Sequence, residues 1–331
     1  MRRLITLSER GASIISSGSA CGFEESHGPL GNKFDIASTD DRFGMKTWEA
    51  AEAEMGRLSL SVAIKKAKIS ASDIDALFAG DLENQCVASS SGLYSFGIPY
   101  VGLYSACSTC TEALLLLSTL IDSGRINIGA AVTTSHNAAA ERQFRTPIEY
   151  GCQRTPTAQW TATAAGSFIL GHEGEVKIKE AVIGKIVDGL SSDATNMGAA
   201  MARAAFDTIY TYFSLSKITP DMCDLVVTGD LGRVGSEILL EMLSREIPTL
   251  TEKHEDCGLL IYGKDCDSHS GGSGCGCSAS VLASHFFPLL RSGKYKRILF
   301  LSTGALMSPG SVLQGENILG IAPCILLEGK I

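Results

Sequence analysis

The chain of 331 residues is long enough for two domains, or for one large fused α/β unit with a substantial core. Hydrophobic residues make up 45% and charged residues 19% of the chain, which is typical of a globular protein and excludes a largely disordered one. The formal net charge of −8, without any basic block, argues against a broad nucleic-acid-binding surface.

The cysteines and the apolar runs indicate a cytosol-like setting. The eleven cysteines are odd in number and lie in apolar or glycine-rich stretches, which predicts reduced thiols rather than disulfides. The first ten residues are too short and too charged to act as a signal peptide. No apolar run reaches 18 residues, so we expect no transmembrane helix.

In chain order, the first half alternates between helices and strands. Residues 47–67 form the clearest helix, because Thr47 can cap its start and the charges match the helix dipole. Residues 138–160 show no clean period, so we expect a long ordered loop of a kind that commonly carries function. The other expected elements are a strand at 12–15 followed by a Gly/Ser loop, a loop at 28–43, a strand at 76–79, a short helix at 84–96, a strand at 99–104, a helix at 111–123, a strand at 127–134, and antiparallel strands at 161–171 and 176–187.

The second half shows the same alternation after a linker-like stretch at 184–197. A glycine- and serine-rich loop at 268–276 precedes its last helix. The expected helices cover 199–216, 235–245 and 277–291, and the expected strands cover 225–228, 297–302 and 318–328.

The turn at Cys107 is the centre of the sequence pattern. It joins a strand-like run at 99–104 to a helix-like run at 111–123, and Ser108 or Thr109 can cap that helix. A thiol at a helix start lies beside free backbone N–H groups, which lower its pKa and can stabilise an anion. The turn therefore predicts either a reactive thiol or, as the ordinary alternative, a small buried cysteine.

Two stretches of the first half return in the second half. Residues 68–82 return as 217–231, both with Lys-Ile, an aspartate and a final Gly-Asp-Leu. The Cys107 helix and its Ser-Gly-Arg end return as the Cys277 helix and Ser-Gly-Lys. We infer a duplicated α/β unit with mostly parallel strands in each half, in which the Cys107 turn faces the turn at 275–277. The predicted halves are 1–184, including loop 138–160, and 185–331.

This arrangement resembles the thiolase and ketosynthase superfamily. Ala106-Cys107-Ser108 matches the nucleophile turn of that superfamily, and residues 302–306 (Ser-Thr-Gly-Ala-Leu) resemble its last glycine-rich loop. The resemblance implies a layered αβαβα fold of two duplicated halves with mixed, mostly parallel sheets. It also implies an oxyanion hole built from the backbone N–H groups of that loop and of Cys107.

Longer stretches resemble one family within this superfamily, the stage V sporulation protein AD (SpoVAD) family. They are spread along the whole chain, which makes the resemblance specific. They are 48–52 (Trp-Glu-Ala-Ala-Glu), 135–145 (Ser-His-Asn-Ala-Ala-Ala-Glu-Arg-Gln-Phe-Arg), 156–161 (Pro-Thr-Ala-Gln-Trp-Thr) and 271–279 (Gly-Gly-Ser-Gly-Cys-Gly-Cys-Ser-Ala).

The family resemblance implies a role in spore formation. It implies a soluble protein on the cytoplasmic side of the spore inner membrane, peripherally associated with membrane subunits of the same operon. Such a protein binds dipicolinic acid (pyridine-2,6-dicarboxylate), free or with calcium, for uptake into the spore and for release on germination. The superfamily resemblance further implies a homodimer. No nucleic acid, cofactor or metal site is expected.

Condensing chemistry requires more than a thiol. Where the ketosynthase relatives carry a histidine, this chain has 228–231 (Thr-Gly-Asp-Leu), and where they carry an asparagine it has the region 275–277. His269 resembles the thiolase histidine only loosely. Without these groups the general acid–base and oxyanion contributions, each about 2–4 kcal/mol, are lost. We therefore expect a retained pocket without catalytic residues.

A small aromatic dicarboxylate needs forked donors and flat apolar walls. Arg142 and Arg145 are the first candidates, with His136 and Asn137 at a strand end. An arginine in a polar loop is commonly a surface residue, and Cys110 can simply pack. The candidate ligand-binding residues are Cys107, Cys110, His136, Asn137, Arg142, Arg145, Cys275, Gly276, Thr303 and Gly304.

Three other readings stay open. The chain can be an active acyltransferase that uses Cys107 as its nucleophile with an unusual partner. It can be a metal or redox protein, if Cys107 and Cys110 converge with Cys275 and Cys277, although the second spacing suits zinc poorly. It can also be a purely structural scaffold for a membrane complex.

Overall fold

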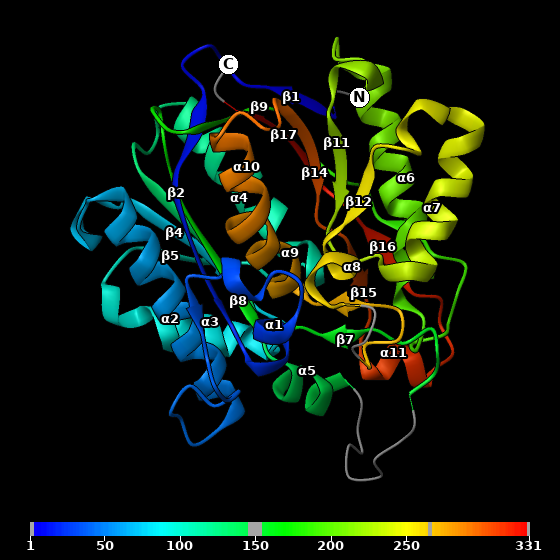
Figure 1. Cartoon of the computed structure of the whole chain (residues 1–331), viewed down its shortest axis with the longest axis horizontal. Helices are drawn as coiled ribbons and strands as arrows, with labels where there is room; N and C mark the ends of the chain where they lie inside the picture. The colour runs from blue at the N-terminus through cyan, green and yellow to red at the C-terminus, as the bar shows by residue number, and fades with distance from the viewer. Residues whose placement is uncertain (1–2, 145–153, 264–266, 330–331) are drawn as a thin grey trace.

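The structure is a computed structural model that describes residues 3–144, 154–263 and 267–329. Its elements form two halves of similar construction, which follow each other along the chain and lie beside each other (Figure 1). None of the helices in these ranges is both long and apolar enough to cross a lipid bilayer.

Each half contributes five strands to one continuous mixed sheet. The spatial order is β5-β4-β6-β8-β2 in the first half and β12-β11-β14-β17-β9 in the second. The second set of strands thus includes β9, which comes before the predicted boundary at residue 184, and β2 pairs with β9 where the halves meet. The bounds are β2 Ala12–Cys21, β4 Ala76–Gly80, β5 Tyr100–Gly102, β6 Gly129–Ser135, β8 Ala164–Gly171, β9 Val176–Val182, β11 Leu225–Thr228, β12 His254–Asp256, β14 Arg297–Leu301 and β17 Cys324–Gly329; β1 Leu4–Thr6 and β3 Ile36–Ala37 flank this path.

The strand directions repeat between the halves as well. Strand β4 is parallel to β5 and β6, as β11 is parallel to β12 and β14. The inner strands β8 and β17 are antiparallel to both of their neighbours. The matching order and directions confirm the predicted fold of two duplicated α/β halves with a mixed sheet.

The helices form layers outside the sheet and between its two halves. Helices α2 and α3 pack together on the first half, and α6 and α7 pack together on the second. Helices α4 and α9 lie in the middle of the molecule (Figure 1), where α4 contacts β6 of one half and β17 of the other. The helix bounds are α2 Trp48–Ala67, α3 Val87–Leu93, α4 Thr109–Asp122, α6 Met197–Leu215, α7 Gly232–Glu246 and α9 Cys275–Val281.

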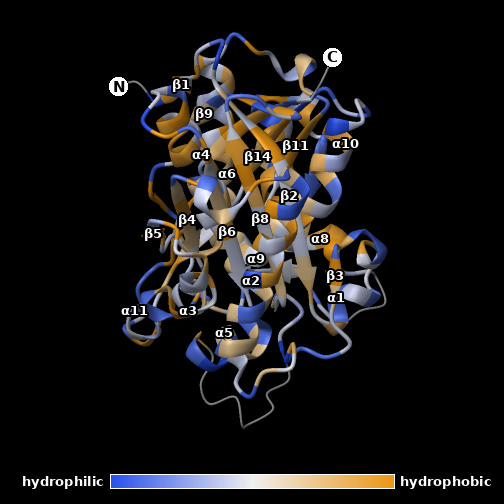
Figure 2. Cartoon of the chain, turned by 90° about the vertical axis from the view of Figure 1, so that its left-hand side faces the viewer, coloured by the Kyte–Doolittle hydropathy of each residue, from blue (hydrophilic) through white to orange (hydrophobic). Residues whose placement is uncertain are grey.

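One hydrophobic cluster spans both halves around the central helices. Leu114 and Leu117 of α4 are fully buried in it, together with Phe168 of β8 and Phe300 of β14. Figure 2 shows the strand β14 as hydrophobic, as a strand covered on both faces requires. Burial of each such side chain contributes about 1.5–3 kcal/mol, so the halves are held together by a common core.

Three sequence-based expectations about elements were wrong. Strand β2 continues to Cys21 instead of ending at residue 15, because its small residues admit α2 closely: a Cβ at Gly18 would lie 2.1 Å from the Ser59 carbonyl oxygen. The expected loop after β6 begins as a helix, α5 (Asn137–Phe144), which starts as soon as the strand ends. The expected last strand is two strands, β16 and β17, because Pro323 separates them.

Shorter elements complete the chain. Strands β10, β16 and β15 form a small separate sheet, and β13 pairs with β7. The remaining bounds are β7 Trp160–Thr161, β10 Val187–Asp188, β13 Gly272–Ser273, β15 Gly304–Leu306, β16 Leu319–Ile321, α1 Phe23–His27, α8 Cys257–Ile261, α10 Phe287–Arg291 and α11 Pro309–Leu313.

Candidate functional site

Cys107 lies on a tight turn between β5 and α4. The turn is a short 3-10 segment that begins at Ala106, whose φ of 48° is in the left-handed region. The predicted cap is wrong, because the Ser108 and Thr109 hydroxyls donate backward to the Ser105 and Ala106 carbonyl oxygens at 2.7 Å. The first N–H groups of α4 therefore receive no side-chain cap.

The Cys107 thiol lies beside a carboxylate from the other half. Asp230 follows β11 and is fully buried, and its charge acts on the thiol. Asp230 accepts bonds from the Thr303 hydroxyl at 2.7 Å, the Gly274 backbone N–H at 3.0 Å and the Ser273 hydroxyl at 3.2 Å. Three donors thus fix the carboxylate beside the thiol.

This environment reverses the expected effect on the thiol. Burial raises the pKa of Cys107 well above its usual value, and the negative charge of Asp230 raises the pKa further. The prediction of a lowered thiol pKa from the helix terminus is therefore wrong. Cys107 is only 6% exposed, and its burial and the neighbouring carboxylate both favour the protonated thiol.

The turn of the second half faces the first, as expected. Cys275 lies in one apolar cluster with Cys107, Leu82 and Ala140, and its thiol donates to the Thr134 carbonyl oxygen at 2.9 Å. Burial is the main reason that the pKa of Cys275 is raised. The nine described cysteines are buried free thiols, and no group of three or more His, Cys, Asp or Glu side chains among the described residues is arranged to hold a metal ion.

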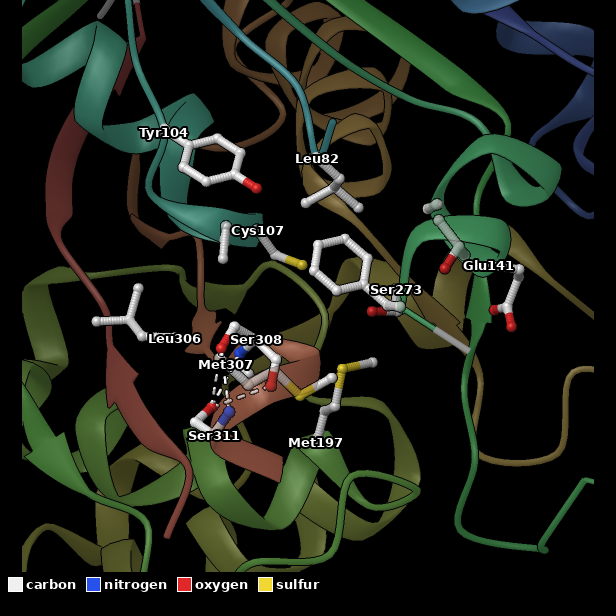
Figure 3. Close-up of a pocket in the computed structure, with 15 residues that line it drawn as sticks. Leu82, Tyr104, Cys107, Glu141, Met197, Ser273, Leu306, Met307, Ser308 and Ser311 are labelled. Atoms are coloured by element: carbon white, nitrogen blue, oxygen red, sulfur yellow. Dashed lines mark hydrogen bonds between the residues drawn. The ribbon is translucent and has the colours of Figure 1, made fainter. Parts of the chain in front are cut away.

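A cavity of about 330 Å³ opens beside Cys107. Figure 3 shows Leu82, Tyr104 and Cys107 on one wall, and Leu306, Met307 and Ser308 on the opposite wall. Among the described lining residues there is no Lys, Arg or His, and Glu141 is the charged member. The lining residues are Leu82, Tyr104, Ala106, Cys107, Ala140, Glu141, Phe144, Thr161, Met197, Ser273, Ala305, Leu306, Met307, Ser308 and Ser311.

The predicted ligand residues near the nucleophile turn are only partly at the cavity. Cys107 lines it, whereas Cys110 is buried behind it, with a pKa raised to about 12 by burial. Thr303 is fully buried and holds Asp230, and Gly304 packs on the turn, since a Cβ there would lie 2.9 Å from the Ser105 carbonyl oxygen. Both residues support the site from behind.

Gly276 has a packing role rather than a place in the cavity wall. A Cβ at this position would lie 2.0 Å from the Ala164 carbonyl oxygen and 2.6 Å from the Ser135 backbone nitrogen. These distances require a glycine, because real Cβ atoms do not approach backbone so closely. The residue lets α9 pack directly on β6 and β8.

His136 and Asn137 lie at the end of β6 but do not line the cavity. The His136 Nε2 atom is 2.8 Å from the Asp41 carbonyl oxygen, and its Nδ1 atom accepts the Ala138 backbone N–H at 3.1 Å. Burial lowers the pKa of His136, so the ring is neutral and fully used in packing. The Asn137 amide donates to the Thr161 carbonyl oxygen at 3.3 Å.

The two candidate arginines lie after β6. Arg142 is on α5 and forms an ion pair with Glu49 of α2, outside the cavity lining. Arg145 lies outside the described residues, so its role stays a prediction. The third arginine of this region, Arg154, lies over the Trp160 ring, with its guanidinium carbon 4.4 Å from the ring centroid.

Sequence reasoning missed most of the cavity wall. Asp230 belongs to the stretch 228–231 that stands in the place of a histidine, but its position beside Cys107 was not predicted. Tyr104 precedes the nucleophile turn and Phe144 lies within the stretch 135–145, and aromatic residues at a proposed pocket were an available signal. Residues 302–306 were recognised as a glycine-rich loop, whereas Met307, Ser308 and Ser311, further along the excursion between β14 and β17, were not predicted by any period in the sequence.

The fold and the cysteine turn define a thiolase-like protein. The chain is similar to a 3-oxoacyl-[acyl-carrier-protein] synthase III from Aquifex aeolicus, with a TM-score of 0.60, 13% identity and coverage of 96% of this chain and 100% of that one. It is also similar to the Acat5 thiolase from Ascaris suum in complex with coenzyme A, with a TM-score of 0.63, 12% identity and coverage of 97% and 100%.

The family follows from the sequence comparisons. The model of the family Stage V sporulation protein AD (SpoVAD) matches residues 2–328. The chain is 42% identical over 316 residues to Stage V sporulation protein AD of Bacillus subtilis, which covers 95% of this chain and 94% of that protein. The chain therefore belongs to the SpoVAD family of sporulation proteins, and it has the fold of an enzyme superfamily.

Proposed function

We propose that this chain binds dipicolinate, free or as its calcium chelate, for uptake into the developing spore, and that it performs no condensing chemistry. The observation that carries this proposal is the contact between Cys107 and Asp230 at the wall of the 330 Å³ cavity. The cavity can hold a small ligand, while burial and the Asp230 charge disfavour the thiolate that catalysis needs.

The contact opposes catalysis for two electrostatic reasons. Acyl transfer needs a thiolate, and burial together with the Asp230 charge disfavours ionisation of Cys107. The tetrahedral intermediate of acyl transfer carries an oxyanion, which a neighbouring carboxylate repels. One lost oxyanion donor costs about 2.7–4 kcal/mol of barrier, and a fixed negative charge at that place adds to the loss.

The cavity walls suit a flat aromatic ligand. Tyr104, Phe144 and Met197 offer apolar surface, and the Ser308 and Ser311 hydroxyls offer polar contacts at one end. A free dianion would lie near Glu141 without a cation among the described lining residues. A one-to-one calcium chelate has no net charge, so this cavity accepts it at a lower electrostatic cost.

Titration calorimetry with dipicolinate, with and without calcium, tests the proposal, with pyridine and phthalate as ligand controls. We expect saturable binding at one site per chain that Ala305→Phe abolishes by filling the cavity. Arg145→Ala and Arg142→Ala test the predicted carboxylate donors, and Arg125→Ala, an exposed arginine after α4, is the matched control. Absence of both heat and thermal stabilisation at millimolar ligand contradicts dipicolinate binding.

The alternative is a thiolase-like acyltransferase, which the position of Cys107 on the cavity wall favours. Incubation with acyl-CoA distinguishes the two functions. Rapid stoichiometric acylation that is lost in Cys107→Ala supports the enzyme. A chain that stays unmodified over hours but binds dipicolinate supports the binding protein.

We also propose a homodimer that forms through the edge strand β5. This strand ends the sheet order, and its three residues, including Tyr100 and Val101, are exposed. An exposed apolar edge strand readily pairs with a second copy. Light scattering should show a dimer that Val101→Lys converts to a monomer, whereas Met222→Lys, a similarly exposed residue in the second half, leaves the dimer intact.

The proposed setting is the cytoplasmic side of the spore inner membrane, with membrane subunits of the same operon as partners. Family membership supports this setting. Co-purification with detergent-solubilised spore membrane proteins tests it, and a chain recovered wholly without them contradicts it.

A further inference from the structure

Two glutamates are buried side by side behind the cavity without the usual donors. Glu52 lies on α2 and is 1% exposed, and Glu83 follows β4 and is 3% exposed. They come from different elements, and each carboxyl affects the pKa of the other.

The hydrogen bonds around the pair leave three of its four carboxyl oxygens without a donor among the described residues. The Glu52 Oε1 atom accepts the Thr134 hydroxyl at 2.8 Å. No N–H or O–H group of the described residues reaches the Glu52 Oε2 atom or either carboxyl oxygen of Glu83. Two carboxylates are both acceptors, so these side chains can hydrogen-bond to each other only when one of them is protonated.

The surroundings favour that protonated form. Asp81 adds a negative charge, and the titratable groups on the neighbouring elements are Cys86 before α3, Tyr100 on β5 and Cys275 on α9, all neutral when protonated. On the side of α5, Arg142 pairs with Glu49 instead. Burial first, and Asp81 second, raise the pKa of Glu83 to about 7, and burial raises the pKa of Glu52.

The same segment forms part of the cavity wall. Leu82 lines the cavity, and its carbonyl oxygen accepts the Gln143 amide at 3.2 Å, next to the cavity residue Phe144. The Asn84 backbone N–H donates to Gln143 Oε1 at 3.1 Å, so segment 81–86 is tied to α5. A change at Glu83 is therefore transmitted to two walls of the cavity.

The backbone of this segment is also strained. Gln85 and Cys86 are consecutive non-glycine residues with φ values of 60° and 51°. Left-handed conformations of such residues persist only where surrounding contacts hold them. The Asp81 carboxylate supplies part of that hold, because it accepts the Glu83 and Ser89 backbone N–H groups, both at 2.8 Å.

We propose that Glu52 and Glu83 share one proton and act as a latch that holds segment 81–86, and with it the Leu82 wall of the cavity, in the closed position. Removal of the proton places two negative charges against each other beside Asp81, and the segment moves away from α2. The cavity wall then loosens. The latch is a property of the protein without ligand.

The consequence for ligand binding rests on the proposed function. When the wall closes, the Glu52–Glu83 pair takes up one proton. A ligand that binds only to the closed wall therefore binds more tightly at low pH. Above the pKa of the pair, affinity falls tenfold per pH unit, because one proton is linked to closure. Binding should be accompanied by proton uptake from the buffer.

Amide hydrogen exchange of the protein without ligand tests the latch. The probes are the Glu83, Asn84 and Ser89 amides, and their protection is corrected for the intrinsic effect of pH. Between pH 6 and pH 8 we expect protection to fall about tenfold in the native chain, as a single proton lost near pH 7 requires. Glu83→Gln replaces the shared proton by a permanent amide donor and should keep protection the same at both pH values.

Two further variants make the test decisive. Glu52→Gln should behave as Glu83→Gln does, so the test survives if one of them fails to fold. Glu25→Gln removes another fully buried carboxyl, which has its own partners in Tyr262 and Thr163, and should leave the pH dependence of segment 81–86 intact. Equal native protection at both pH values, or a tenfold change that persists in both latch variants, overturns the latch. The exchange result is independent of dipicolinate, so failure of ligand binding is distinguishable from failure of the latch.

Discussion

The two halves use the same strand-end aspartate in different ways. Asp81 and Asp230 stand in the matching Gly-Asp-Leu motifs after β4 and β11, and both are fully buried. Asp81 accepts bonds from Glu83 and Ser89, a few residues away, and so braces its own loop. Asp230 accepts bonds from Ser273, Gly274 and Thr303, which belong to two segments far from it in the sequence, and it lies beside Cys107 of a third.

This difference shows how one structural position can acquire two functions after duplication. In the first half the carboxylate stabilises a local segment that lines the cavity. In the second half it joins two glycine-rich segments beside the nucleophile turn, and its charge adds to the effect of burial on the pKa of the Cys107 thiol. Both aspartates are equally buried, and they differ only in which segments supply their hydrogen-bond donors.

The largest expected effect comes from removing each of the two aspartate carboxylates in turn. Asp230→Ala leaves three buried donors without an acceptor, and each such group costs about 1–3 kcal/mol. We expect a loss of about 4 kcal/mol in the free energy of unfolding, measured by urea denaturation. Asp81→Ala leaves fewer segments unconnected and should cost about 2 kcal/mol. Equal losses would contradict the comparison.

The pH dependence of stability gives a second way to compare the halves. Burial raises the pKa of Glu25 in the first half and of Asp256 in the second to about 7, above their values in the unfolded chain. The folded state then binds more protons between about pH 4.5 and 7, so stability falls as pH rises through this window. We expect a loss of up to about 3 kcal/mol per group by pH 8.

Urea denaturation at pH 5, 6, 7 and 8 checks this trend. Glu25→Gln and Asp256→Asn should each flatten it, by removing one titrating group from one half. Stability that rises from pH 5 to pH 8 would show that these carboxyls are ionised in the folded protein.

Asp230→Asn tests the effect of the second-half carboxylate on the Cys107 thiol. The substitution keeps the shape but removes the charge that raises the pKa of Cys107, so the thiolate fraction increases. We expect alkylation of Cys107 by iodoacetamide at pH 8 to be about tenfold faster, a gain equivalent to one pKa unit. Mass spectrometry of the Cys107 peptide measures the rate. The matched variant Asp81→Asn should leave the rate unchanged, and acceleration in both would point to general loosening.

The smallest expected effect concerns the starts of two helices. Thr47 caps α2, because its hydroxyl accepts the Ala50 N–H at 3.2 Å, so Thr47→Ala should cost about 1 kcal/mol of stability. Ser108 is the first residue before α4 and makes no cap bond. Ser108→Ala should therefore lower the free energy of unfolding less than Thr47→Ala in the same urea assay. A larger loss for Ser108→Ala would support the predicted cap at Ser108.

Local signals explain what could be predicted from the sequence. The α2 cap, the repeated Gly-Asp-Leu and the Cys107 turn involve neighbouring residues, and they were sufficient for the duplicated fold and the family. The predicted packing of the Cys107 turn on the Cys275 turn is confirmed, because the two cysteines share one cluster. These features depend on spacing along the chain.

The features that could not be predicted depend on contacts between distant segments. The prediction of a lowered Cys107 pKa was wrong because burial, and then the charge of Asp230 from the other half, outweigh the helix terminus. Strand β2 looked like a loop after residue 15, because serine and glycine favour loops unless a helix packs closely on them. The cavity wall at 305–308 depends on an excursion whose direction only tertiary contacts determine.

The close packing at Gly276 limits the substitutions that this site can accept. With a backbone oxygen 2.0 Å from the place of a Cβ, no amino acid with a side chain fits there unless α9 or β8 moves. A single nucleotide change can alter Asp230, yet it cannot open space behind the second glycine-rich turn. A side chain at this position would require a coordinated shift of the backbone, so the second glycine-rich turn can change only together with the elements packed on it.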